Sequence, residues 1–392
     1  MNITCPKCKS ILDIDSAFKG KTITCPICAK RFEANDDGPT IKVVSRGDGE
    51  SRHSSDNDLA GKFAEVMGVT KPKGFKWKEF FSEVFKKHTR KEVESYFMVG
   101  TAETTPDIFG VSTEWPKPWM FARCLMGCVI LYLTVYCSVR WFGLKLMSNI
   151  TDLIIIGSFA VPISLALLFF EINVRRNVSL YEFVRFLFFG GIISIYLLLP
   201  LNPLNTFIKS AVPEEWGAIS AGPVEEFAKL ITLLLLVRGR NYRYILNGLL
   251  LGAAVGAGFA MFESAGYAFI NLLAQKNVEA MNSNILSRAF FAPVGHVAYS
   301  SIWAGALWRV KGDKPFAFSM LGDWRFLKLF LLGVILHGFW NSPLLMKQFG
   351  EDGSWYAKTA IVGVIAWFVI FSLVQEGLEQ IRKEQKDILS NG

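Results

Sequence analysis

Six polar residues stand within long apolar stretches of the chain, and their side chains could carry out acid–base chemistry. Ionisable side chains are costly in hydrocarbon, so residues of this kind usually mark a functional site. Two histidines, several carboxylates and an amide on separate stretches indicate a polar centre built inside a membrane domain. The residues are Glu225, Glu226, Glu263, His296, His337 and Asn341.

The paired glutamates are followed by a lysine that could neutralise one of them. Lys229 lies one helical turn after Glu225, so both side chains fall on one helix face. The neighbouring carboxylate, desolvated and facing a like charge, would hold a proton more tightly and could serve as a general base. The alternative is a buried ion pair that only joins helices.

Glu263, Arg288 and His296 are the next candidates along the chain. Glu263 could take part in the chemistry, or it could only orient a histidine or arginine. His296 follows Arg288 by eight residues, about two helical turns, which predicts that both lie on the same side of one helix. Arg288 could support the site or only reach the lipid–water interface.

His337 and Asn341 share one face of a predicted helix, because they are four residues apart. An imidazole and an amide can both donate hydrogen bonds to a developing oxyanion. Asn341 could instead only hydrogen-bond to a neighbouring helix. Small residues recur every fourth position at Gly248, Gly252 and Gly256, which predicts close packing that brings Glu263 towards the paired glutamates.

Composition places these residues in a membrane protein. The chain has 392 residues, of which 51% are hydrophobic and only 19% charged, and its mean hydropathy is +0.32. Such values favour the membrane class over a soluble protein. About eight apolar spans are predicted, near residues 118–140, 152–172, 180–200, 217–237, 244–272, 286–308, 326–346 and 355–375.

Charge and cysteine usage predict the orientation of the chain. If the N-terminus is cytoplasmic, the loops on that side carry more lysine and arginine than the outer loops. The N-terminus opens on a cysteine motif rather than an apolar run, so no cleavable signal peptide is expected. We therefore expect a multi-pass cell-membrane protein with both termini in the cytoplasm.

Four N-terminal cysteines are spaced like zinc ligands. Cys5 and Cys8 form one CxxC pair, and Cys25 and Cys28 form a second after sixteen intervening residues. Two such pairs predict a tetrahedral four-thiolate site for structural Zn²⁺, with short strands between them. A disulfide pair or redox-active thiols are the alternatives. Reduced thiolates agree with a cytoplasmic N-terminus.

The predicted fold is an all-α polytopic membrane protein with about eight transmembrane helices, preceded by a small β zinc ribbon and a flexible linker. A basic, aromatic stretch after the linker could be an interfacial helix on the anionic inner leaflet or a helical subdomain packed on the ribbon. The predicted parts are the ribbon (1–33), a disordered linker (34–70), a basic juxtamembrane region (71–115), the membrane domain (116–378) and a cytoplasmic tail (379–392).

The motifs of the membrane domain resemble those of the PrsW family of intramembrane proteases, which is related to the CAAX prenyl proteases and the CPBP membrane proteins. The resemblance covers residues 218–341, and the N-terminal ribbon lies outside it. Two positions depart from the pattern: the prenyl proteases carry histidine at the position of Glu263, and many PrsW members carry asparagine at the position of Ser264. The matching motifs are the double glutamate with Lys229, Phe259-x-x-x-Glu263, Arg288 through His296, and His337-x-x-x-Asn341.

The resemblance implies cleavage of a membrane-anchored protein, such as an anti-sigma-factor-like or other single-span substrate. Glu225 or Glu226 would activate water with help from His296, and His337 with Asn341 would stabilise the oxyanion. Glu263 would adjust the basicity of a histidine. The same side chains could instead bind a catalytic zinc, although no His-Glu-x-x-His pair is present.

Two non-proteolytic functions compete with this hypothesis. The polar core could bind a peptide or lipid headgroup in a membrane scaffold or receptor whose zinc ribbon is the working part. An ion-coupled transporter is the other, but no repeat of the motifs occurs in the first half of the domain. Expected partners are a single-span membrane protein, the lipid bilayer and, through the ribbon, a cytoplasmic protein. Nucleic acid is not expected to bind.

Overall fold

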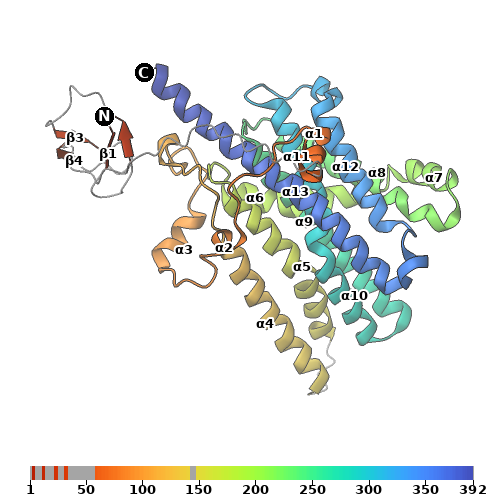
Figure 1. Ribbon diagram of the computed structural model, residues 1–392. Coiled ribbons are helices and arrows are strands. Elements are labelled where there is room, and N and C mark those ends of the chain that lie inside the picture. Colours follow the sequence, from red (N-terminus) through yellow and green to blue (C-terminus); the bar gives the residue numbers. More distant parts are fainter. Residues whose placement is uncertain are drawn as a thin grey trace. The chain divides into compact units, whose positions relative to one another are not determined.

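The computed structural model describes residues 2–4, 11–13, 22–24, 31–33, 58–141 and 147–391 (Figure 1). The chain divides into two compact units. The first comprises Met1–Leu59 with Asp107–Ser112, and the second comprises Ala60–Pro106 with Thr113–Gly392. The second unit contains all the helices that carry the polar residues, so the polar centre lies wholly within this unit.

The first unit contains two antiparallel hairpins. Strands β1 (Asn2–Thr4) and β2 (Ile11–Asp13) pair with Ile3 opposite Leu12. Strands β3 (Thr22–Thr24) and β4 (Arg31–Glu33) pair in the same way, and a 3₁₀ turn η2 follows at Ile108–Gly110. The four cysteines and the linker residues 34–57 lie outside the described residues. The zinc ribbon therefore stays a prediction.

The second unit is built from helices. Its long helices run mainly through residues 120–391, and shorter ones precede them. The α-helices are α1 (Leu59–Met67), α2 (Trp77–Phe80), α3 (Arg90–Phe97), α4 (Met120–Trp141), α5 (Met147–Ile172), α6 (Leu180–Tyr196), α7 (Asn202–Ser210), α8 (Ala221–Val237), α9 (Ile245–Gln275), α10 (Val278–Phe291), α11 (His296–Lys311), α12 (Trp324–Asn341) and α13 (Met346–Asn391). The 3₁₀ helices are η3 (Glu214–Ser220), η4 (Ala292–Val294) and η5 (Phe318–Gly322).

Helix α1 lies within the segment 34–70, for which the sequence analysis predicts a disordered linker. Its residue Phe63 packs edge-on against Phe368 of α13 with ring centroids 5.7 Å apart, and Ala64 is buried. Six of the nine residues of α1 are hydrophobic, and the contact of Phe63 with α13 gives this end of the segment a packed helical structure. The predicted basic region that follows contains the short helices α2 and α3 and the 3₁₀ turn η2.

Among the residues that the structure describes, four helices are long and apolar enough to cross a membrane: α4, the part Ser148–Ile172 of α5, α9, and the part Gln348–Ser390 of α13. The other helices at predicted spans are shorter, with 17 residues in α6 and α8, 16 in α11 and 18 in α12. About 20 apolar residues are needed to cross the hydrocarbon core. The structure therefore supports a polytopic membrane protein, with four candidate spans among the described residues, and the other four of the eight predicted spans stay a prediction.

The predicted span 286–308 is broken in two, which corrects the expectation of one continuous helix. Helix α10 ends at Phe291, the turn η4 follows, and α11 begins at His296. Pro293 lacks a backbone N–H, and Gly295 has a non-helical conformation with φ −99° and ψ −143°. Arg288 and His296 consequently lie on different helices, and His296 is the first residue of its helix.

Helix α9 packs in the interior of the unit, and its small residues determine which helix comes close. A Cβ atom on Gly252 would lie 2.3 Å from the carbonyl oxygen of Ser300, and one on Gly256 would lie 2.4 Å from that of His296. The glycine stripe therefore packs against α11, and not against α8 as the sequence analysis expects. Glu263, two turns beyond this stripe, is brought next to the start of α11.

A second close approach joins α8 to α12. A Cβ atom on Gly222 would lie 2.7 Å from the carbonyl oxygen of Val334 and 2.9 Å from the amide nitrogen of Gly338. Only glycine permits this separation, because any side chain would overlap the backbone of α12. The first turn of α8 is thereby held against the turn that carries His337, which places the paired glutamates beside that imidazole.

The glycine stripe gives a direct test of the packing. Gly252→Ala should lower the free energy of unfolding by about 1–3 kcal/mol, since the added methyl group overlaps backbone atoms. Gly266→Ala on the same helix is the matched control, because its Cβ meets no atom within 4 Å. Thermal unfolding of the purified protein in detergent measures both. Equal unfolding temperatures for the two variants would contradict the packing of α9 on α11.

Candidate active site

A cavity of about 820 Å³ lies between α8, α9, α10, α11 and α12. Small residues, among them Ala221 and Gly295, and aromatic residues, among them Trp340, form parts of its wall. The polar side chains on the wall include Glu225, Glu263, Arg288, His296, His337 and Asn341. Five of the six predicted residues therefore surround one space, and Glu226 lies behind its wall.

Glu226 is fully buried and is held by three hydrogen bonds. Its Oε1 accepts from Lys229 Nζ at 2.5 Å and lies 2.9 Å from His337 Nδ1. Its Oε2 accepts from the indole N–H of Trp303 at 2.9 Å. These partners come from α8, α12 and α11. A carboxylate with this many partners is suited to fixing three helices together rather than to taking a proton from water.

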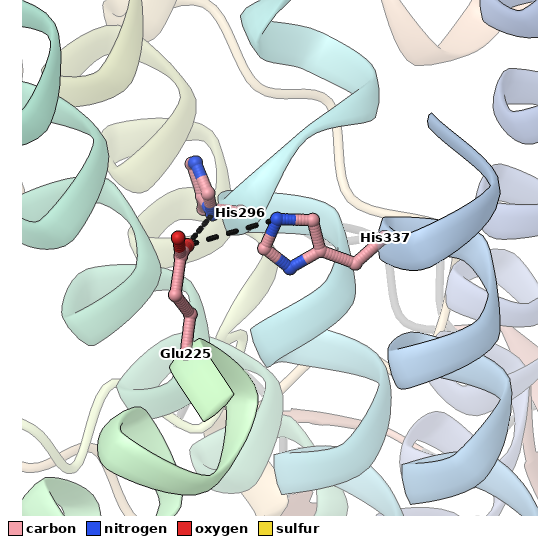
Figure 2. A group of neighbouring side chains, drawn as sticks. All are labelled: Glu225, His296 and His337. Atoms are coloured by element: carbon pink, nitrogen blue, oxygen red, sulfur yellow. Dashed lines mark ion pairs between the residues drawn. The ribbon is translucent and has the colours of Figure 1, made fainter. Parts of the chain in front are cut away.

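Glu225, the preceding residue, faces the cavity and is bound much less tightly. Its Oε2 is buried and has no hydrogen-bond partner among the described residues. The same atom lies 3.8 Å from His296 Nδ1 and 3.6 Å from His337 Nε2. Figure 2 shows the carboxylate pointing towards both imidazole rings. Burying an acceptor without a partner is unfavourable, so this oxygen is available for a ligand.

His296 is held from both sides at the start of α11. Its Nε2 lies 2.9 Å from Glu263 Oε2, and its Nδ1 lies 3.1 Å from Lys229 Nζ. The ammonium of Lys229 can only donate, so it bonds to a lone pair on Nδ1. The proton of a neutral ring then lies on Nε2 and is donated to Glu263. The lone pair on Nδ1 points towards the same region as Glu225.

His337 is also held by a carboxylate on one side, but the two ring nitrogens exchange roles compared with His296. Its Nδ1 faces the Glu226 carboxylate, which fixes a proton there and leaves Nε2 towards Glu225. The ring is stacked on Tyr299, with centroids 5.2 Å apart and an angle of 25° between the planes. His296 meets it edge-on, with centroids 5.0 Å apart. Each imidazole is therefore oriented by a carboxylate behind it.

Glu263 is itself held by a cation. It forms an ion pair with Arg288, whose Nε donates to Ser264 Oγ at 2.8 Å. The Arg288 guanidinium also lies over the ring of Tyr267, 4.6 Å from its centroid. Arg288 therefore supports the site and is not a free interfacial charge. Ser264, the position at which this chain departs from the family pattern, supplies an acceptor to that arginine.

Three ligand-type atoms converge in the cavity. Glu225, His296 and His337 each offer one such atom, and the three atoms lie within 4.8 Å of one another (Figure 2). Two histidines and a carboxylate are a ligand set found in catalytic zinc sites, where each histidine also donates its other N–H to a carboxylate. Glu263 and Glu226 stand in those outer positions. The residues present therefore fit a metal ion.

Two functional neighbours were missing from the sequence analysis. Trp303 binds Glu226, and Tyr299 stacks on His337. Both lie on α11: Tyr299 is three residues after His296, and Trp303 is seven residues after it. This spacing places all three side chains on one face of the helix. A tryptophan in an apolar helix usually requires an acceptor for its indole N–H, and this could have indicated a carboxylate nearby. Asn341 lines the cavity one turn after His337, as predicted.

Residues 181–374 match the model of the family described as PrsW family intramembrane metalloprotease. These residues form a PrsW-family domain, and every residue of the polar centre lies within it. The resemblance drawn from the motifs is confirmed for this part of the chain. No curated protein and no solved structure matches the chain.

The buried ion pair predicts a large effect on stability. Lys229→Met should lower the free energy of unfolding by about 3–5 kcal/mol, because the Glu226 carboxylate would remain buried without its cation. The double variant Lys229→Met/Glu226→Gln removes that charge and should recover part of the loss. Thermal unfolding in detergent measures both variants, with the exposed Lys209→Met as a control. A single variant as stable as the control would contradict the pairing.

Proposed function

We propose that this protein is an endopeptidase that cleaves membrane-anchored proteins in or next to the bilayer, with Glu225 as the group that activates water. The contrast between the neighbouring glutamates carries the proposal. Glu226 has three hydrogen-bond partners, whereas Glu225 Oε2 has none and faces two imidazoles across the cavity. The PrsW-family domain at residues 181–374 supports proteolysis as the activity.

The reaction assigns one role to each side chain of the cavity. Glu225 takes a proton from a water molecule as its oxygen adds to the scissile carbonyl carbon. Asn341 stands on the wall where its amide can donate a hydrogen bond to the resulting oxyanion. His337 Nε2, 3.6 Å from Glu225 Oε2, carries a lone pair that can accept a hydrogen bond from the attacking water. Glu225 then returns the proton to the nitrogen of the leaving amine, and the carbon–nitrogen bond breaks. The products are a new carboxyl terminus and a new amino terminus.

His296 and its neighbours act on the geometry of this step. His296 Nδ1 accepts from Lys229 and lies 3.8 Å from Glu225 Oε2, so the ring bounds the space in which the water meets the carboxylate. Glu263 fixes the ring through Nε2, and Arg288 holds Glu263 in turn. This chain of contacts runs over three helices, α11, α9 and α10. We assign Glu263 and Arg288 as positioning residues rather than as groups that touch the substrate.

The cavity suggests the conformation in which a substrate is cleaved. A volume of about 820 Å³ is enough for several residues of extended peptide. A transmembrane helix with its side chains is about 10–12 Å wide, and its backbone carbonyls are already hydrogen-bonded. We infer that a single-span substrate, which could be anti-sigma-factor-like, unwinds locally before cleavage. Orientation with both termini in the cytoplasm and recruitment of a partner by the zinc ribbon are part of the same proposal.

A metal-dependent form of this protease is a second candidate, favoured by the convergence of Glu225, His296 and His337. These three residues would hold the ion, and a zinc ion there would polarise the substrate carbonyl. Against it, the Lys229 ammonium lies 3.1 Å from His296 Nδ1, the atom that would have to bind the ion. Two cations so close together repel, and we therefore favour the glutamate-activated water.

Exchanging each glutamate for its amide separates their roles. Glu225→Gln should reduce cleavage by roughly 10²–10⁴-fold while the unfolding temperature stays near that of the wild type, because its buried oxygen has no partner to lose. Glu226→Gln should lower the unfolding temperature, because it weakens three buried contacts. The measurement compares new N-termini of membrane proteins in cells with wild type and each variant. Unchanged fragments with folded Glu225→Gln would refute the proposal.

Chelation distinguishes the two forms of the protease. We use the full chain with Cys5, Cys8, Cys25 and Cys28 changed to serine, so that the ribbon thiolates cannot bind zinc. Cleavage by this variant should persist in a strong chelator, and elemental analysis should find no bound zinc. One zinc ion per chain, lost on His296→Ala, would favour the metal-dependent form instead. The zinc content is informative even if a variant is inactive.

A further inference from the structure

A segment before the first long helix has one buried and one exposed aromatic face. Within residues 71–88, Phe80 and Val84 are buried, and Phe75 packs against Trp115 and Phe371 with ring centroids 4.9 Å and 4.3 Å apart. Three further aromatic side chains, at intervals of four residues, are exposed to the outside, and the first of them also packs edge-on against Phe371. They are Trp77, Phe81 and Phe85, whose exposed fractions are 58%, 37% and 90%.

Lysines surround these exposed rings. Lys76 pairs with Glu79 at 2.8 Å, and Lys86 pairs with Glu83 at 2.5 Å. Lys78 and Lys87 are exposed and have no ion pair with any described residue. Lys73 and Lys117, also exposed, line a neighbouring pocket of about 510 Å³ together with Phe80. The exposed side of the segment therefore combines large apolar rings with uncompensated positive charge.

Contacts with α4 place this segment beside the end of a candidate membrane span. Phe81 packs against Phe121, the second residue of α4, with ring centroids 6.0 Å apart. Arg123 donates from Nη2 to the carbonyl oxygen of Lys86 at 2.5 Å. Helix α4 is apolar and exposes large side chains such as Ile130 along its length. The aromatic face is thus continuous with a surface that has the character of a lipid-facing helix.

We propose that residues 71–88 lie on the membrane surface and bind anionic phospholipid headgroups through Lys78, Lys87 and the neighbouring lysines. Aromatic rings of this kind favour the headgroup region, and lysines near an anionic leaflet are attracted to it. A peptide or protein partner would also cover an aromatic face. Continuity with α4 and the positive charge favour the lipid surface, and this inference is independent of the proposed proteolysis.

The experiment uses the full chain in nanodiscs of phosphatidylcholine alone or of an equal mixture with phosphatidylglycerol. The wild type should unfold about 4 °C or more higher in the anionic nanodiscs, and added salt should reduce that gain. Hydrogen exchange of residues 75–87 should be slower in the anionic lipid. The variant Lys78→Gln/Lys87→Gln should lose most of the gain and of the protection.

The matched control is Lys276→Gln/Lys314→Gln, which removes the same charge from two exposed lysines in other loops. It should keep the full gain in anionic nanodiscs. The proposal is overturned if the wild type gains nothing from phosphatidylglycerol, or if Lys78→Gln/Lys87→Gln retains the gain. It is also overturned if both variants lose it equally, since the effect would then be one of net charge. Phe85→Ser, at a position with no packing to lose, should weaken the protection in both lipids.

Discussion

The buried ion pair between Lys229 and Glu226 is the interaction on which the rest of the membrane domain depends. Both side chains are fully buried, and a buried pair is stable only when further hydrogen bonds satisfy its remaining atoms. Those bonds come from His337 and Trp303, so the pair determines how α12 and α11 meet α8. Lys229 also contacts His296 and the face of Phe259, which adds α9. One ion pair therefore organises four helices.

Close approach of the backbones makes this organisation possible. The polar contacts named above, from Lys229–Glu226 at 2.5 Å to His296–Glu225 at 3.8 Å, act only at short range. Bulky residues at the helix crossings would move the partner side chains apart. Gly222 against α12 and the glycine stripe of α9 against α11 remove that obstacle. The break at Pro293 and Gly295 adds the last requirement, because it starts a new helix at His296 and turns that side chain towards Glu263. Packing and chemistry are set by the same few positions.

The sequence predicted the identity of the polar residues well and their partners less well. Ionisable residues in apolar stretches are identified by their type alone, and all of those named for the centre surround or adjoin one cavity. Spacing within a helix correctly placed His337 and Asn341 on the wall of one cavity. It failed across 286–308, because a proline and a glycine end the helix between Arg288 and His296. Nor could spacing show that the glycine stripe faces α11, since a pattern on one helix does not identify the neighbour.

The sequence pattern also could not predict the different roles of two adjacent residues. Consecutive glutamates look alike in the sequence, and only the surrounding helices distinguish Glu226, which has three hydrogen bonds, from Glu225, whose Oε2 has none. Helix α1 packs against α13 through Phe63 and Phe368, which are more than three hundred residues apart in the chain. Local composition does not show which distant helix a segment contacts. The N-terminal cysteines lie outside the described residues, and their zinc site remains a prediction from spacing.

Separation of the two glutamates also has a practical consequence for finding what the protein acts on. Successive residues on a helix point about 100° apart, so α8 directs one carboxylate into the protein and the next into the cavity. The bonds that hold the cavity in shape pass through Glu226 and leave Glu225 out. A chain with an amide at position 225 should therefore keep an intact binding space without cutting what enters it. Such a chain would serve as a substrate trap, retaining its natural target long enough for the complex to be isolated and the target identified.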